Sequence, residues 1–369
     1  MQKQFASGIL QSLFSGDLPR SRLLSGLLTL VFLGLAFAPF ITSGARPLNT
    51  AATICVYIIL VASYDLLLGY TGIVSFAHTM FFGIGAYGIG LSFSSAGAYW
   101  WVALLGLTTA ILLTIMLALV IGLFALRVRA IFYSMITLAV ASSFAVLASQ
   151  LSEMTGGEDG KTFSVPDILS PSFRLFETEL FGRMVDGKVI TYYIVFFSSL
   201  VLFLFLLRVV NSPFGRVLQA IRENEFRAEA LGYRTVLYRV LANCLAALVA
   251  ALAGALMALW LRYVGPKTML SFDVMTDILL IVVIGGMGTM YGAVIGSALF
   301  IIAQNYLKSL MAQAATSLVG VPFLAQALHP DRWMLWLGVL FILSVYFFPT
   351  GIVGKLRGNR RNEQIECPH

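Results

Sequence analysis

The stretch Tyr99–Leu126, YWWVALLGLTTAILLTIMLALVIGLFAL, runs for 28 residues without a charged side chain. A membrane-spanning helix needs about 20 consecutive, largely apolar residues, so this stretch is long enough to cross a bilayer. The rest of the chain has the same character, because 59% of its 369 residues are hydrophobic and only 11% are charged. Soluble domains carry roughly 25% charged residues, so the composition excludes them and predicts an all-α, polytopic integral membrane protein.

Ten apolar runs, separated by charged, glycine or proline-containing breaks, are candidate membrane spans of one transmembrane domain, 1–369. Their approximate bounds are 23–42, 49–68, 73–94, 99–126, 130–151, 190–210, 237–261, 273–287, 291–310 and 333–348. The third run carries GIGAYGIG and the eighth runs into GGMG. These two are the candidates for broken or re-entrant spans.

The basic residues predict how the spans are oriented, because Lys and Arg accumulate in short cytoplasmic loops. With a cytoplasmic N-terminus and ten crossings, 15 of the 24 Lys and Arg residues fall on the cytoplasmic side. The basic tail KLRGNRR, 355–361, returns to the same side. We therefore expect both termini to be cytoplasmic, and we read the net charge of +7 as a signal of orientation rather than of nucleic-acid binding.

Two hydrophilic segments interrupt the apolar pattern. Residues 153–189 contain TGGEDG and two prolines and are too polar to cross lipid, so they are predicted to form an external loop. Residues 212–239 have no proline after Pro213, and apolar residues recur among charges at helical spacing, which predicts an amphipathic helix ending near Gly232. Its composition fits a solvated loop, a position on the lipid headgroups or binding to a cytoplasmic partner.

Three ionisable side chains fall within the predicted spans: Asp65 in the second, His78 in the third and Asp277 in the eighth. A charge inside the bilayer is costly and by default suggests a pathway or a buried pair. Both aspartates could lie close enough to a span end to reach water, and His78 could instead join two helices by a hydrogen bond. With Thr79, which follows His78, these three residues are our candidates for a translocation pathway.

The sequence offers little material for catalysis or for a cofactor. The three cysteines form no CxxC pair, no acidic cluster lies beside any of the three histidines, and no GxxxxGK[ST] motif occurs. GIGAYG at 83–88 fits GxGxxG but lies inside an apolar run, where glycines let helices approach closely. We expect no catalytic residue, no metal, no cofactor and no nucleic-acid partner.

Five blocks of sequence, in order, together resemble LivM-type permeases, the membrane subunits of branched-chain amino acid ABC importers. The blocks are GYTGIVSFAHTMFFGIGAY (69–87), RVRAIFYSMITLA (127–139), TGGEDG (155–160), FGRVLQAIRENEFRAEALGY (214–233) and VVIGGMGTMYGAVIGSAL (282–299). The resemblance covers roughly residues 50–350. The chain departs from a commoner form of the family at Lys161 and Thr162, where a small apolar residue is frequent after TGGEDG.

The resemblance implies a type II-like importer permease of the bacterial inner membrane that works by alternating access. It implies a LivH-type second permease, two cytoplasmic ATP-binding subunits and an external solute-binding protein as partners within the lipid bilayer. It also implies that 212–239 is a cytoplasmic coupling segment that rests on an ATPase. The residues that match the family's pattern there are Arg222, Glu223, Asn224, Glu225, Glu229, Ala230 and Gly232.

The resemblance implies branched-chain amino acids as substrates, with urea, short amides or aromatic acids as alternatives within the same class. An ion-coupled secondary transporter or channel is the rival from another class. Such proteins usually carry intramembrane acids or ion-coordinating breaks, which are few here. A membrane-embedded enzyme is the weaker rival, because clustered His, Asp or Cys residues are lacking.

A short internal match suggests where a pathway would lie. SFAH at 75–78 and SFDV at 271–274 belong to the third and eighth spans, which cross the bilayer in opposite directions in the predicted topology. Inverted repeats are common in transporters and place the pathway where the two halves meet. On this hypothesis the third and eighth spans line the route and bring His78, Thr79 and Asp277 to it.

Overall fold

The structure is a computed structural model in which residues 21–41, 44–125, 130–170, 172–174, 186–317, 332–347 and 351–354 are described. Each predicted span contains one long helix. These helices are α2 (Arg22–Ile41), α3 (Ala45–Thr71), α4 (His78–Ala96), α5 (Trp100–Ala125), α6 (Ala130–Gln150), α8 (Gly187–Asn211), α11 (Thr235–Leu261), α13 (Phe272–Gly285), α14 (Met290–Ser317) and α16 (Trp333–Phe347).

Short elements connect the long helices. They are α7 (Ser152–Thr155), η1 (Gly157–Asp159), β1 (Lys161–Thr162), η2 (Asp167–Leu169), α9 (Pro213–Glu223), α10 (Glu225–Ala230), β2 (Tyr263–Val264) and α12 (Pro266–Met269). Eight segments of the described chain are helical, long and apolar enough to cross a membrane, with α12 and α13 counted together. The prediction of an all-α, multi-pass membrane protein is confirmed.

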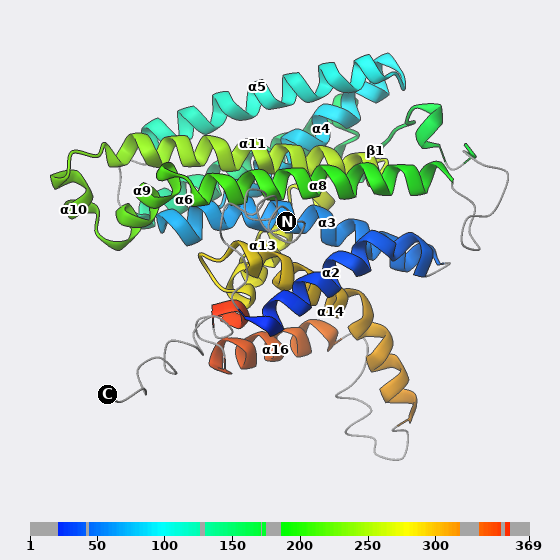
Figure 1. Cartoon of the computed structure of the whole chain (residues 1–369). Coiled ribbons are helices and arrows are strands. Elements are labelled where there is room, and N and C mark those ends of the chain that lie inside the picture. The colour runs from blue at the N-terminus through cyan, green and yellow to red at the C-terminus, as the bar shows by residue number, and fades with distance from the viewer. Residues whose placement is uncertain are drawn as a thin grey trace, which may run out of the picture.

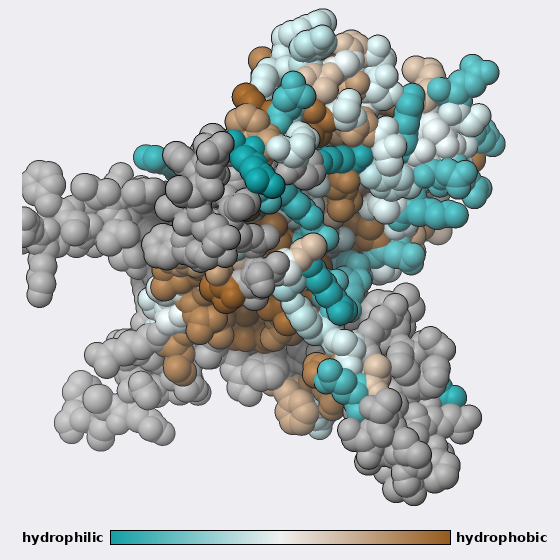
Figure 2. All heavy atoms as spheres, turned by 90° about the vertical axis from the view of Figure 1, so that its right-hand side faces the viewer, coloured by the Kyte–Doolittle hydropathy of each residue, from teal (hydrophilic) through white to brown (hydrophobic). Residues whose placement is uncertain are grey.

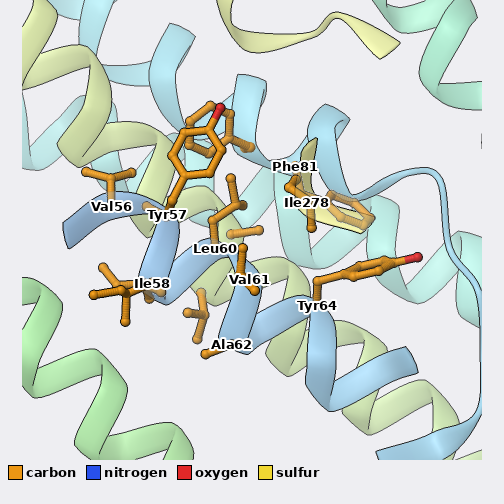
Figure 3. Close-up of a cluster of buried hydrophobic side chains, with 14 of the residues drawn as sticks. Val56, Tyr57, Ile58, Leu60, Val61, Ala62, Tyr64, Phe81 and Ile278 are labelled. Carbon is orange, nitrogen blue, oxygen red and sulfur yellow. The ribbon is translucent and has the colours of Figure 1, made fainter. Parts of the chain in front are cut away.

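Helix α3 is the centre of the bundle. Its 27 residues are apolar on nearly every side, and a helix of that kind is stable only where it is surrounded by other apolar groups. It packs against α8, α11, α13 and α14, and in Figure 1 it runs beside α8 and α11 along the length of the molecule. Figure 3 shows its side chains leaving the helix in several directions, with Phe81 of α4 and Ile278 of α13 among them.

Glycines set the distance between α4 and α11, the two helices that share the most extensive contact. A Cβ atom at Gly85 would overlap the Ala251 carbonyl group, and one at Gly254 would overlap the Phe82 carbonyl group. The backbones can therefore approach this closely only without side chains at those positions. The GIGAYGIG sequence lies inside a continuous α4, which supports its interpretation as a packing motif.

The third and eighth spans are irregular at their beginnings. Helix α4 starts only at His78, after an unwound segment, 72–77, that follows α3. The predicted eighth span, 273–287, is nearly covered by α13, which has 14 residues and is preceded by the short helix α12 and a break at 270–271. At 1.5 Å per residue, α13 is about 21 Å long and is shorter than a hydrocarbon core of about 30 Å. The third span is thus non-helical at its beginning but is not broken at its glycines, and the eighth begins just after a break in the helix.

The end of the molecule opposite α10 is closed by a small ribbon. Strands β1 and β2 pair antiparallel, with Lys161 opposite Val264 and Thr162 opposite Tyr263. Arg262, which ends α11 with a φ of 56°, donates a hydrogen bond of 2.7 Å to the Leu169 carbonyl oxygen. Figure 2 shows this end, where hydrophilic residues gather at the upper right and hydrophobic residues lie in the lower centre.

Parts of the sequence predictions lie outside the described residues. These are the first residues of the block 127–139, positions 171 and 175–185 of the predicted external loop, and the basic tail 355–361. The predicted location of both chain ends is therefore not addressed by the structure.

We expect Gly85→Val to destabilise the protein, because the new side chain would force α4 away from α11. Overpacking of this kind costs about 1–3 kcal/mol or more. The measurement is the melting temperature of the purified permease in detergent. Gly34→Val on α2 is the matched control, because a Cβ atom there meets no atom within 4 Å. Equal melting temperatures for the two variants would contradict the role assigned to Gly85.

Candidate functional site

The segment 212–239 forms two short helices rather than one. Ser212 caps α9 by accepting a hydrogen bond from the Gly215 amide, and Pro213 occupies the first turn, where its missing N–H is tolerated. Asn224 has extended backbone angles that end α9, and its side chain accepts a hydrogen bond of 2.9 Å from the Arg227 amide at the start of α10. The predicted end near Gly232 is correct, since α10 stops at Ala230 and Gly232 has a φ of 89°.

Arg222 points from α9 into the bundle. Its guanidinium group donates a hydrogen bond to the carbonyl oxygen of Gly69, near the end of α3. One helical turn earlier in α3, Asp65 is 2% exposed and accepts a hydrogen bond of 2.8 Å from the Gly288 amide, in the turn between α13 and α14. We call Asp65, Gly69, Arg222 and Gly288 the Arg222 cluster. It joins α9 to both α3 and the α13–α14 turn.

The glycines of the Arg222 cluster are required by its geometry. A Cβ atom at Gly69 would overlap both the Asp65 carboxylate and the Gly288 amide. Gly288 itself has a φ of 80°, which L side chains rarely adopt. Asp65, predicted for a pathway, is thus buried in an interhelical contact, and Arg222, predicted to face an ATPase, binds the membrane bundle.

Two other residues of the predicted set are also held by contacts within the segment. Glu225 forms a bidentate ion pair with Arg239, with N–O distances of 2.5 and 3.0 Å. Glu229 accepts a hydrogen bond of 2.8 Å from the Thr235 hydroxyl group. These contacts fold α10 back onto the first turn of α11.

The remaining predicted residues, Glu223, Ala230 and Gly232, lie on the exposed surface, as do Arg222, Asn224 and Glu229, whose side chains nevertheless make the contacts described above. Two large apolar side chains that the sequence analysis did not select lie there with them, because Phe226 is 86% exposed and Leu231 is 71% exposed. Leu231 follows the last residue of α10, and its exposure contrasts with the burial of Leu218 and Ile221 on α9. We call Glu223, Phe226, Ala230, Leu231 and Gly232 the α9–α10 surface; α9 and α10 lie at one end of the molecule in Figure 1.

His78 and Thr79 are buried between α3 and α4, with His78 fully covered and Thr79 3% exposed. The Nε2 atom of His78 lies 2.9 Å from the Ser63 hydroxyl oxygen and 3.3 Å from the Leu60 carbonyl oxygen. The imidazole ring also packs edge-on against Tyr64. These contacts fit the alternative interpretation of His78, a hydrogen bond that joins two helices.

Asp277 lies half-buried on α13, where its Oδ2 atom accepts a hydrogen bond of 3.4 Å from Gln304 of α14. One turn earlier on the same helix, Asp273 is exposed, and its neighbour Phe272 is 54% exposed. Phe272 stacks on Phe76, with ring centroids 6.1 Å apart. The phenylalanines of the two matching motifs, SFAH and SFDV, are therefore in contact.

No group of three or more His, Cys, Asp and Glu side chains that could hold a metal ion occurs among the residues that the structure describes. The polar groups considered above instead bind one another across helices. The arrangement is that of a membrane bundle with a short projecting helix pair.

The comparison with known families decides what kind of bundle this is. Residues 46–345 match the family described as the permease component of branched-chain amino acid transport systems. The chain belongs to this family. It is therefore a transport permease component, as the resemblance of its five sequence blocks implied.

Three curated relatives carry the same description in their names. The high-affinity branched-chain amino acid transport system permease proteins LivM of Salmonella typhimurium and Escherichia coli are 26% and 27% identical to this chain, over 90% of it and 75% of each relative. The probable branched-chain amino acid transport permease protein LivM of Methanocaldococcus jannaschii is 27% identical over 58% of each chain. No solved structure matches the chain significantly.

We expect Asp65→Ala to destabilise the protein, because it leaves the buried Gly288 amide without its acceptor, at a cost of about 1–3 kcal/mol. Asp65→Asn should recover much of that loss, since its side-chain oxygen can still accept the hydrogen bond. Melting temperatures in detergent provide the measurement, and Asp167→Ala, at an exposed position in η2, is the control. If Asp65→Ala and the control have the same melting temperature, the hydrogen bond between Asp65 and Gly288 contributes nothing to stability.

Proposed function

We propose that this protein is the permease subunit of an ATP-driven importer that translocates branched-chain amino acids by alternating access. Family membership and the names of the relatives support the substrate class. The observation that supports coupling to ATP hydrolysis is the projecting helix pair α9–α10, which is bonded to the membrane bundle through the Arg222 cluster. The chain has no P-loop of its own, so hydrolysis belongs to another subunit.

The proposal assigns the two ends of the bundle to the two sides of the bacterial inner membrane. The α9–α10 end, with the segment 212–239, is cytoplasmic, in agreement with its basic flanks. The end with β1 and β2, to which the loop 153–189 belongs, is external. Two ATP-binding subunits, a LivH-type second permease and a solute-binding protein complete the importer.

The α9–α10 surface is the proposed contact with an ATP-binding subunit. Large apolar side chains that are exposed at a water-facing end are typical of protein–protein contacts, particularly when charged residues surround them. Phe226 and Leu231 supply the apolar part, and Glu223 supplies a charge. The internally bonded residues Arg222, Asn224, Glu225 and Glu229 act by shaping and anchoring this surface.

The anchoring of the segment supports alternating access as the mechanism of transport. A displacement of α9 acts through Arg222 on the end of α3 and, through the neighbouring Asp65–Gly288 hydrogen bond, on the α13–α14 turn. Helices packed as tightly as these shift as units rather than deform continuously. ATP binding and hydrolysis on the cytoplasmic side would thus move the bundle relative to the second permease. The solute-binding protein would deliver substrate on the external side.

The alternatives differ in substrate or in energy source. Urea, short amides or aromatic acids would use the same machinery, and binding assays on the cognate solute-binding protein discriminate among them. An ion-coupled secondary transporter would work without partners. Uptake of radiolabelled leucine into proteoliposomes that contain both permeases, the ATPases and the binding protein tests the proposal. Uptake that persists without ATP and without the ATPases would refute it.

We expect the double variant Phe226→Ala, Leu231→Ala to lose association with the ATP-binding subunits, because the apolar centre of an interface contributes most of its affinity. The amount of ATPase that co-purifies with the permease pair should fall by at least about tenfold, because a loss of only about 1.4 kcal/mol of binding free energy weakens the affinity tenfold. Ile168→Ala, at an apolar residue of η2 that is 45% exposed at the opposite end, is the control. Undiminished co-purification of the double variant would remove this surface from the contact.

We expect Glu223→Lys to abolish ATP-driven uptake and to leave the permease assembled with its sibling, because Glu223 is exposed and the substitution reverses a charge at the contact. Glu225→Lys should also abolish uptake, but by breaking the ion pair with Arg239, so it should also lower the melting temperature. The pair of uptake and melting measurements separates the two causes. Normal uptake by both variants would overturn the coupling assignment.

A further inference from the structure

The stacked rings of Phe76 and Phe272 lie where two interrupted spans meet. Phe76 precedes α4 and Phe272 begins α13, so the contact joins the N-terminal ends of two helices that start within the bundle. Both side chains are partly accessible, with Phe272 at 54%. The next residue along α13 is the exposed carboxylate of Asp273. We call Phe76, Phe272 and Asp273 the aromatic step.

Two segments of the chain connect the Arg222 cluster to the aromatic step, and their lengths limit the distance between the two. The Cβ position of Gly72 lies 3.3 Å from the Arg222 side chain, and the four residues from there to Phe76 span at most about 14 Å. Along α13, the 13 helical steps from the end near Gly288 back to Phe272 rise about 20 Å. Both distances are shorter than a hydrocarbon core of about 30 Å, so the aromatic step lies inside the bundle, between its two ends.

The unwound segment 72–77 is built to remain unwound inside the bundle. The Phe76 amide donates to the Thr137 hydroxyl oxygen at 3.1 Å, and the Ser134 hydroxyl group donates to the Val74 carbonyl oxygen at 3.1 Å. Helix α6 thereby replaces hydrogen bonds that a helix would make within itself. Non-helical backbone at membrane depth is tolerated only inside protein or along a water-filled cavity.

The exposed face of the aromatic step cannot lie against lipid. Asp273, the neighbour of Phe272 on α13, is exposed, and a charge inside a bilayer is costly unless it meets water or a partner group. Ser271 already caps α13 through the Val274 amide, so the helix does not need Asp273 as its cap. The chemistry of the face is that of an amphipathic ligand, with aromatic rings for an apolar group and a carboxylate for a cation.

We propose that the aromatic step is a contact of the transported amino acid within the membrane bundle, with the rings of Phe76 and Phe272 against its aliphatic side chain and the Asp273 carboxylate facing its α-ammonium group. This inference rests on the proposed importer function. It assigns a substrate role to Phe76, Phe272 and Asp273, in place of the buried His78 and Thr79.

Cysteine accessibility tests whether the aromatic step lines a water-filled route. Phe272→Cys is placed in a chain whose Cys55, Cys244 and Cys367 are replaced by alanine, within the full importer. A positively charged, membrane-impermeant methanethiosulfonate reagent should modify it at least about tenfold faster than Phe197→Cys, a 57% exposed position on α8. Leucine with loaded binding protein and ATP should slow the modification.

The outcomes of the labelling experiment are decisive in either direction. Modification of Phe272→Cys at the rate of Phe197→Cys in every nucleotide state overturns the proposal. If Phe272→Cys fails to assemble, Thr276→Cys, one turn further along α13 and partly accessible, takes its place and the same criterion applies. Labelling does not depend on which solute is carried, so its failure is distinct from a failure of the proposed function.

Transport then tests the chemistry of the contact. Asp273→Asn and Phe272→Ala should each lower ATP-driven leucine uptake at least about tenfold, the scale expected for a lost charge-assisted hydrogen bond or a lost aromatic contact. ATPase stimulation by loaded binding protein should persist in both, because the Arg222 cluster is intact. Asp167→Asn is the control. Unchanged uptake in both variants overturns the inference, whereas absence of ATP-driven uptake by the wild type would refute the proposed function itself.

Discussion

A helix that ends inside a bilayer leaves backbone N–H and C=O groups that no water can satisfy, and this constraint explains the polar contacts at the interruptions of the bundle. The segment 72–77 is satisfied by Thr137 and Ser134 of α6. The turn between α13 and α14 is satisfied in part by Asp65, and the end of α3 by Arg222. Each of these interruptions is thus matched by a polar side chain from a neighbouring element.

The sequence predicted the spans well because hydrophobic length is a local property. Each predicted run contains one helix, and the glycines of α4 were correctly interpreted as packing residues. It did not predict the partners of polar groups, because those depend on long-range pairing. Arg222 bonds to Gly69, 153 positions away, and Asp65 to Gly288, 223 positions away. Matching these residues to a family pattern could identify them as special but could not say which way they point.

In the amphipathic segment 212–239, the sequence contained a sign of the second helix that the prediction did not use. Asn is a favoured N-cap residue, and Asn224 in the middle of RENE could have indicated a second helix start. The prediction of one helix over this segment was therefore incomplete, since a second helix, α10, begins at Glu225 after the Asn224 cap and carries the exposed Phe226. By contrast, the two-residue match between SFAH and SFDV pointed to a real contact, because Phe76 and Phe272 stack.

The proposed coupling and the proposed substrate contact are connected by the same two elements. The segment 72–77 and helix α13 both run from the Arg222 cluster to the aromatic step, one joined to the end of α3 and the other to the Gly288 turn. A displacement of α9 that moved Gly69 relative to Gly288 would therefore shift Phe76 relative to Phe272. An unwound segment and a short helix respond differently to such a displacement, since one can bend and the other moves as a rod. On both proposals, a displacement of α9 would therefore change the distance between Phe76 and Phe272, and with it the width of the proposed substrate route.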